Sequence, residues 1–219
     1  MQSLSWVQQI AIGFLHIMLA ITVHEAAHGL VADKLGDNTA RMAGRVTLNP
    51  FKHIDPLGTI ILPLVMYLLT GFMFGWAKPV PVDWRKLNNP RRDTALVAVA
   101  GPLANFLMLL VWSAIFALSP QIAGWSTWVG VPLFHMATFG ILINAVLMAL
   151  NLLPLLPLDG GRIVSSLLPA NAAMLYQKSE PWGFLILIGL LATGVLARIL
   201  MPAVSFLEII SARIVGIIF

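Results

Sequence analysis

The chain has 219 residues, of which 59% are hydrophobic and 10% are charged, with a net charge of +4 and a mean hydropathy of +0.89. A soluble domain carries about 25% charged residues, so this composition excludes a soluble globular enzyme, a disordered chain and a coiled coil. Zero cysteines exclude a disulfide framework, a thiolate zinc site and a cysteine nucleophile. No long segment carries a basic cluster, and we expect no nucleic-acid partner.

Six apolar segments follow one another along the chain, at residues 4–32, 57–76, 94–118, 132–158, 181–201 and 202–219. About 20 apolar residues cross the core of a bilayer, so the first five segments are long enough, whereas the sixth is shorter and carries Glu208 and Arg213. The sequence therefore predicts an all-α polytopic membrane protein, a bundle of about five to six hydrophobic segments in contact with the lipid bilayer. We expect one membrane-embedded domain over residues 1–219.

The loops between the segments indicate how the chain is oriented in the membrane. Two loops hold most of the basic residues, namely Lys34, Arg41, Arg45 and Lys52 in the first and Lys78, Arg85, Lys86, Arg91 and Arg92 in the second. The loop at residues 119–131 is uncharged and contains Trp125 and Trp128. Because basic loops stay in the cytoplasm, both basic loops are predicted inside. The segment 57–76 between them is then expected to dip into the membrane and return, with a simple span as the alternative.

Residues 24–28 read His-Glu-Ala-Ala-His near the end of the first apolar segment. Positions i and i+4 lie on one face of a helix, so His24 and His28 can bind one metal ion, with Glu25 beside them as general base. Ionisable residues inside a membrane segment are costly and mark function by default. The alternative is a helix end at which these side chains merely meet lipid headgroups.

Two imidazoles without a thiolate indicate zinc, which needs a third protein ligand and an open position for water. The residue types that can supply this ligand are found at His16, His53, Asp55, His135, Asp159 and Glu180. His135 and Asp159 lie at opposite ends of the fourth segment, about 36 Å apart along a helix, so only one of them can reach the metal. Asp159 follows prolines that break the helix and precedes Gly160 and Gly161, which permit a tight turn.

Three motifs occur in a fixed order: His24-Glu25-Ala26-Ala27-His28, Gly101-Pro102-Leu103-Ala104-Asn105, and Asn151 through Gly160. This pattern, which covers about residues 20–165, resembles the site-2 protease family of intramembrane zinc metalloproteases, in its compact bacterial type without PDZ or CBS domains. The resemblance implies one zinc ion on His24, His28 and Asp159, with Glu25 as the catalytic residue. It also implies that Asn105 and Asn151 lie near the site as contacts to the substrate or the oxyanion.

The function that this resemblance implies is hydrolysis of peptide bonds within or near transmembrane helices of single-pass membrane-protein substrates. Zinc would lower the pKa of a water molecule, and Glu25 would take its proton and pass it to the leaving amine. The location implied is the plasma or inner membrane, with the active site near the cytoplasmic leaflet. A zinc-binding transporter and a non-catalytic helix-binding relative are the alternatives, and the oligomeric state is left open.

Residues 42–50, with the sequence MAGRVTLNP, differ in kind from the apolar segments. Val46, Thr47 and Leu48 favour extended structure, and a glycine and a proline bound them. In the site-2 protease family this region resembles a short membrane-associated β-loop that pairs with substrate, as an exposed strand edge can. An ordinary cytoplasmic β-hairpin is the alternative.

Overall fold

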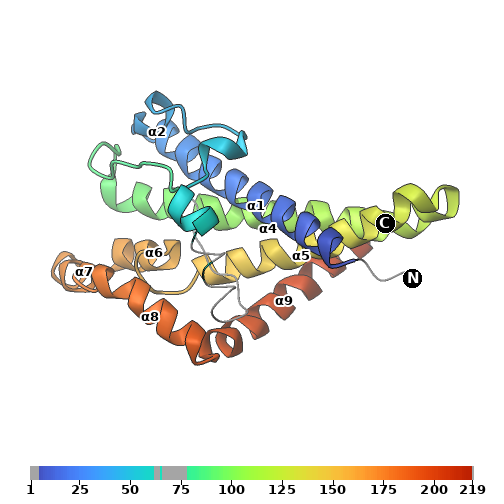
Figure 1. The fold of residues 1–219 in the computed structure, drawn as a ribbon. Coiled ribbons are helices and arrows are strands. Elements are labelled where there is room, and N and C mark those ends of the chain that lie inside the picture. The colour runs from blue at the N-terminus through green and yellow to red at the C-terminus, as the bar shows by residue number, and fades with distance from the viewer. Residues whose placement is uncertain (1–4, 62–64, 66–77, 219) are drawn as a thin grey trace.

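The computed structural model describes residues 5–61, 65 and 78–218, and helices joined by turns and loops make up this part of the chain. Its elements in chain order are α1 (Trp6–Lys34), α2 (Thr39–Met42), η1 (Pro50–Lys52), η2 (Pro56–Ile61), α4 (Pro90–Trp125), α5 (Thr127–Asn151), α6 (Asp159–Leu167), α7 (Ala170–Gln177), α8 (Glu180–Ala192) and α9 (Val195–Ile218) (Figure 1). None of these described residues forms a strand. The predicted all-α class is thus confirmed.

Four of the described helices are long and apolar enough to cross a membrane, at Ile10–Lys34, Pro90–Trp125, Thr127–Asn151 and Val195–Gly216. The prediction of a multi-pass membrane protein is therefore confirmed in its general form. The segment 57–76 lies largely outside the described residues. The prediction that this segment re-enters the membrane therefore stays a prediction.

The boundary between the last two predicted segments was wrong. The sequence predicted segments at 181–201 and 202–219, but the helix breaks at Gly194, whose φ of 70° is a conformation that glycine adopts without steric cost. A 13-residue apolar helix, α8, precedes this break, and α9 runs on through Pro202. Proline is tolerated inside membrane helices, where neighbouring groups satisfy the freed carbonyl, so Pro202 does not end the span.

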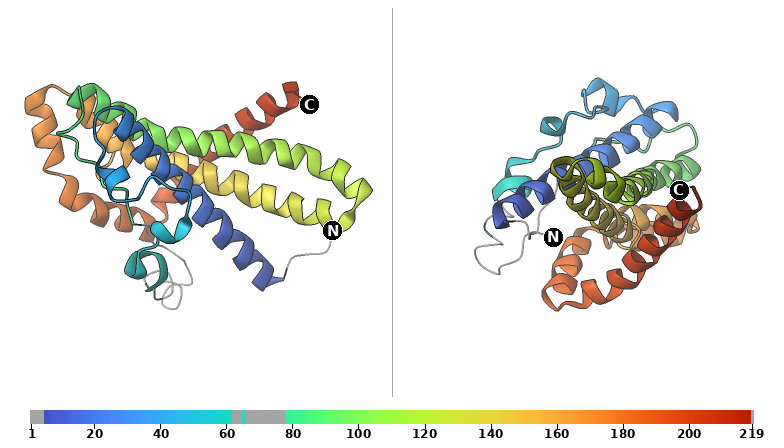
Figure 2. Two further views of the ribbon diagram at one scale, coloured as in Figure 1. Left: turned by 90° about the horizontal axis from the view of Figure 1, so that it is seen from above. Right: turned by 90° about the vertical axis from the view of Figure 1, so that its right-hand side faces the viewer.

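Three helices form the frame that positions the site. Helix α1 begins with a reciprocal capping box between Ser5 and Gln8 and ends at the first basic loop. Helix α4 runs antiparallel to α1, and α5 returns alongside α4 after a short turn at Ser126, so that α1 and α5 run in the same direction (Figures 1 and 2). The C-terminal ends of α1 and α5 consequently lie at one end of the bundle, as a metal site shared by the first and fourth predicted segments requires.

The β-loop expected at residues 42–50 is not found. Residues 43–48 form a turn and bends, and Gly44 reverses the chain with a φ of 62°. A side-chain contact, and not hydrogen bonds between strands, holds this segment: Arg45 is buried and donates a 2.7 Å hydrogen bond to the Lys78 carbonyl. The expectation failed because extended propensity needs a partner strand, and the described part of the chain offers none.

Candidate metal centre

The two histidines of the HEAAH motif lie one turn apart on α1, and both are buried. His28 Nδ1 lies 2.7 Å from the Val97 carbonyl, which can only accept, so Nδ1 carries the proton. His24 Nδ1 lies 2.5 Å from Asn105 Oδ1 and donates to it in the same way. Hydrogen bonds of this kind fix the tautomer and the orientation of metal-binding imidazoles. Both Nε2 atoms are left as free acceptors that face the same point.

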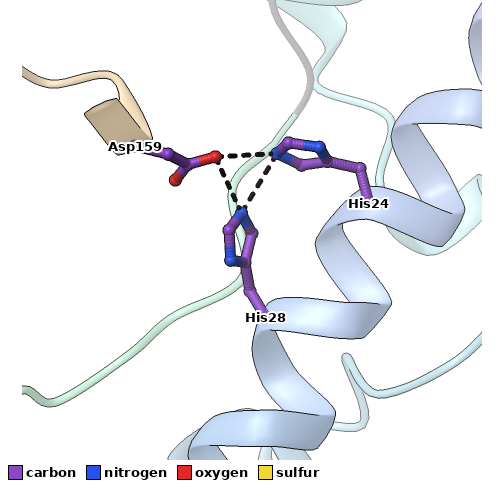
Figure 3. A group of neighbouring side chains, drawn as sticks. All are labelled: His24, His28 and Asp159. Carbon is purple, nitrogen blue, oxygen red and sulfur yellow. Dashed lines mark hydrogen bonds and ion pairs between the residues drawn. The ribbon is translucent and has the colours of Figure 1, made fainter. Parts of the chain in front are cut away.

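Asp159, the first residue of α6, completes this group. Its Oδ2 atom lies 3.2 Å from His24 Nε2 and 3.3 Å from His28 Nε2, and the two Nε2 atoms are 3.0 Å apart (Figure 3). Tetrahedral zinc with bonds of about 2.0–2.1 Å places its donor atoms about 3.3–3.4 Å from one another. Three converging lone pairs repel unless a cation lies between them, and Asp159 Oδ2 is buried without a hydrogen-bond donor. The geometry and the donor set therefore fit a zinc ion.

Gly101 on α4 makes room for the two imidazoles. A Cβ atom at this position would lie 2.4 Å from His28 Nε2 and 2.5 Å from His24 Nε2, well inside van der Waals contact. Only glycine lets α4 approach the donor atoms this closely. The glycine of the GPxxN motif is thus explained by packing against the HEAAH histidines.

The connection between α5 and α6 brings Asp159 to the histidines. Helix α5 ends at Asn151, and α6 begins at Asp159 after a seven-residue connection. Gly160 lies inside the first turn of α6 rather than in a tight turn after the aspartate. A Cβ atom on Gly160 would lie 2.3 Å from the Leu153 carbonyl oxygen, so glycine allows α6 to begin close to the end of α5.

Glu25 lies beside the donor atoms and is held by the loop that precedes α4. The Val80 backbone N–H donates a 2.6 Å hydrogen bond to Glu25 Oε2. The loop is fastened in turn by Asp37, a fully buried carboxylate that accepts a 2.7 Å hydrogen bond from the Asp83 N–H. Together these contacts place one wall of a cleft of about 700 Å³ next to Glu25.

The walls of this cleft are mostly apolar. Side chains from α1, α5 and α8 line it, among them Ile21, Leu147, Leu150 and Leu187. Asn151, at the end of α5, also lines the cleft, and its Nδ2 donates to the Leu147 carbonyl at 3.0 Å. The arrangement places one carboxylate, three side chains that could hold a metal ion, and one amide along an apolar groove.

The other candidates for the third ligand lie elsewhere. His16 bonds to the Ile12 carbonyl and packs on Trp112, His53 bonds to the Thr47 carbonyl, Asp55 accepts from the Gly58 N–H, His135 packs on Phe134, and Glu180 pairs with Arg162. Among the described residues, the one group of three or more side chains that could hold a metal is His24, His28 and Asp159.

Asn105 and Asn151, both expected near the site, occupy different places. Asn105 is fully buried and does not line the cleft, because its amide is engaged with His24 and with Asn144. Asn144, a buried amide on apolar α5, was not among the residues predicted from the sequence. Its signal was a polar residue in a membrane helix, a class that is rare and often functional. Val80 was not predicted either, because it contributes through its backbone and leaves no residue-type signal.

Comparisons with known proteins agree with this geometry. The model of "Peptidase family M50" matches residues 121–194. The chain is 38% identical over 194 residues to a Bacillus subtilis (strain 168) protein named "Putative zinc metalloprotease YwhC", covering 86% of this chain and 84% of that protein. Rip2 of Mycolicibacterium smegmatis, which carries the same description, is 30% identical over 83% of this chain and 66% of that protein. No solved structure matches the chain. The chain therefore belongs to peptidase family M50, the site-2 protease family, and is a zinc metalloprotease of the membrane.

Proposed function

We propose that this protease hydrolyses peptide bonds within or near transmembrane helices of single-pass membrane proteins. The observation that carries the proposal is the position of Glu25 and the three donor atoms along an apolar cleft among membrane-spanning helices. Ile21, Leu147 and Leu150 offer no partners to the side chains of a soluble peptide, but they suit the apolar side chains of a membrane segment. An apolar membrane segment is therefore the substrate surface that this cleft can bury.

In this proposal His24, His28 and Asp159 hold the zinc ion. When bound, zinc supplies Lewis-acid chemistry and makes water acidic near neutral pH. Glu25 acts as the general base and later returns the proton to the leaving amine. Because Oε2 accepts the hydrogen bond from the Val80 N–H, the other carboxylate oxygen, Oε1, is the one proposed to take the proton.

The two asparagines take separate roles. Asn151 lines the cleft and is the amide that can turn toward an oxyanion. Asn105 orients His24 through its 2.5 Å hydrogen bond and does not contact substrate. The resemblance implied a contact to the substrate or the oxyanion for both residues, whereas in this proposal only Asn151 makes such a contact.

The active site is proposed to open near the cytoplasmic leaflet of the plasma or inner membrane. Helix α1 carries His24 and His28 toward the end at which the first basic loop begins, whereas the turn between α4 and α5 lies at the far end of the bundle (Figure 1). Trp125 ends α4, Trp128 lies in the first turn of α5, and both side chains are exposed. Basic loops are retained in the cytoplasm and tryptophans favour the membrane interface. Charge and aromatic placement therefore support one orientation.

The test uses the purified full chain in liposomes with a panel of single-span model proteins that carry Gly-Pro pairs at different depths. Mass spectrometry of the products locates the cut bond, with Glu25→Gln as the matched inactive control. We expect cuts inside the apolar segment that are absent with Glu25→Gln. Cuts confined to the soluble flanks would overturn the intramembrane assignment. Zinc crossing the membrane without any cleavage would favour a transporter instead.

A further inference from the structure

A chain of hydrogen bonds continues from the metal centre into the interior of the bundle. Asn144 on α5 is 1% exposed, and its Oδ1 accepts a 3.0 Å hydrogen bond from Asn105 Nδ2. Asn144 Nδ2 donates in turn to the Gly140 carbonyl at 2.8 Å. With the bond from His24 to Asn105, the chain links α1, α4 and α5 at a depth where polar groups are rare.

The direction of every bond in this chain is fixed from its far end. A backbone carbonyl can only accept, so Gly140 requires the NH₂ group of Asn144 and turns the Asn144 oxygen toward Asn105. Asn105 must then present its own NH₂ to Asn144 and its oxygen to His24. That oxygen requires a proton on His24 Nδ1, which leaves Nε2 free to bind a metal.

Without Asn144, Asn105 loses the partner that sets its orientation. The remaining acceptor for Asn105 Nδ2 is the Ala20 carbonyl at 3.4 Å, a long and therefore weak hydrogen bond. An Asn105 amide turned the other way would present NH₂ to His24 Nδ1 and shift the imidazole proton to Nε2. The donor atom of His24 would then be blocked.

We infer that Asn144 is a positioning residue that sets the tautomer of His24 through Asn105. The inference rests on the proposed role of His24 as a zinc ligand. Loss of Asn144 is expected to weaken zinc binding by about 10- to 100-fold, as for other residues that orient metal ligands. Asn144 itself touches neither metal nor substrate.

A purely structural role for Asn144 predicts a different result. Ser113 on α4 donates a 3.0 Å hydrogen bond to Ser211 on α9, and both hydroxyls are buried. This contact joins two helices in the same way but belongs to no chain that reaches His24. Ser113→Ala is therefore the matched control for the loss of one buried interhelical hydrogen bond.

The experiment measures zinc affinity by chelator competition, and the absorption spectrum of bound Co²⁺, in the full chain in detergent. Asn144→Leu should lose 10- to 100-fold in affinity and change the Co²⁺ spectrum, whereas Ser113→Ala should match the wild type. Asn144→Asp should restore binding, because a protonated carboxyl group in this buried site can accept from Asn105 and donate to Gly140. If Asn144→Leu does not fold, Asn144→Ala takes its place.

A double-variant comparison tests the route through Asn105. In an Asn105→Ala background, Asn144→Leu should have no further effect on zinc affinity, because coupled residues are not additive. Equal affinities for Asn144→Leu and Ser113→Ala would overturn the inference while leaving the proposed function intact. A wild-type chain that binds no zinc would overturn both.

Discussion

Glu25 Oε2 accepts a 2.6 Å hydrogen bond from the Val80 backbone N–H, across 55 residues of sequence. This contact holds the proposed catalytic base through a backbone group, which only a proline substitution removes. It also ties the position of Glu25 to the loop that Asp37 and Arg45 hold against α1. The loop before α4 is thus a structural part of the active site as well as its wall.

Val80→Pro removes this N–H while leaving the metal donors untouched. We expect kcat to fall on the order of 10- to 100-fold, since small misplacements of a catalytic group have effects of this size. Zinc content should stay at one ion per chain. Val80→Ala, which keeps the N–H, should retain a higher kcat than Val80→Pro. Equal kcat values for the two variants would show that the hydrogen bond does not position Glu25.

Gly101→Ala tests the close approach of α4 to the histidines. The added methyl group would lie within 2.5 Å of both Nε2 atoms, so zinc affinity should fall by at least about 10-fold. Gly124→Ala lies on the same helix in open space and should keep wild-type zinc binding. It should also add about 0.5–1 kcal/mol of stability, because alanine favours helix over glycine. Chelator competition and thermal unfolding measure both effects.

The absence of cysteine allows the orientation in the membrane to be tested with single introduced thiols. Arg85 has a side chain that is 91% exposed near the site, and Trp128 is 91% exposed at the far end of the bundle. In intact cells, Trp128→Cys should react with a membrane-impermeant maleimide, and Arg85→Cys should react only after lysis. Labelling of both positions from outside would refute the proposed orientation.

Glu25→Gln separates metal binding from catalysis. The amide cannot accept the proton of water, so cleavage should fall on the order of 10²- to 10⁴-fold. Zinc should remain bound, because the three donor atoms belong to other residues. Metal analysis alongside a cleavage assay measures both quantities. Loss of zinc together with activity would instead place Glu25 among the ligands.

The three residues predicted as metal ligands lie together in the structure, whereas parts of the chain around them differ from the prediction. The i, i+4 spacing of His24 and His28 specifies one helix face, but it does not select the third ligand among the six candidates. The proline break before Asp159 favoured this residue, and the resemblance implied it as the ligand, because the contact between α1 and α6 leaves no local pattern. Val80 and the Gly140 carbonyl act through the backbone, which residue types do not reveal.

The errors in the fold have similar causes. Residues 181–219 are apolar on both sides of Gly194, so hydrophobicity could not locate the break between α8 and α9. The proline at 202 misled the prediction, since the α9 helix continues through it. At residues 42–50 the propensity of Val46 and Thr47 was outweighed by tertiary contacts of Arg45.

The central claim is that His24, His28 and Asp159 hold one catalytic zinc ion. The most direct test is metal analysis and zinc X-ray absorption spectroscopy of the purified wild type and of Asp159→Ala. We expect one zinc per wild-type chain, bound by two nitrogen ligands and by oxygen at about 2.0–2.2 Å, and substoichiometric zinc in Asp159→Ala. One full equivalent of zinc with an unchanged spectrum in Asp159→Ala would contradict the account.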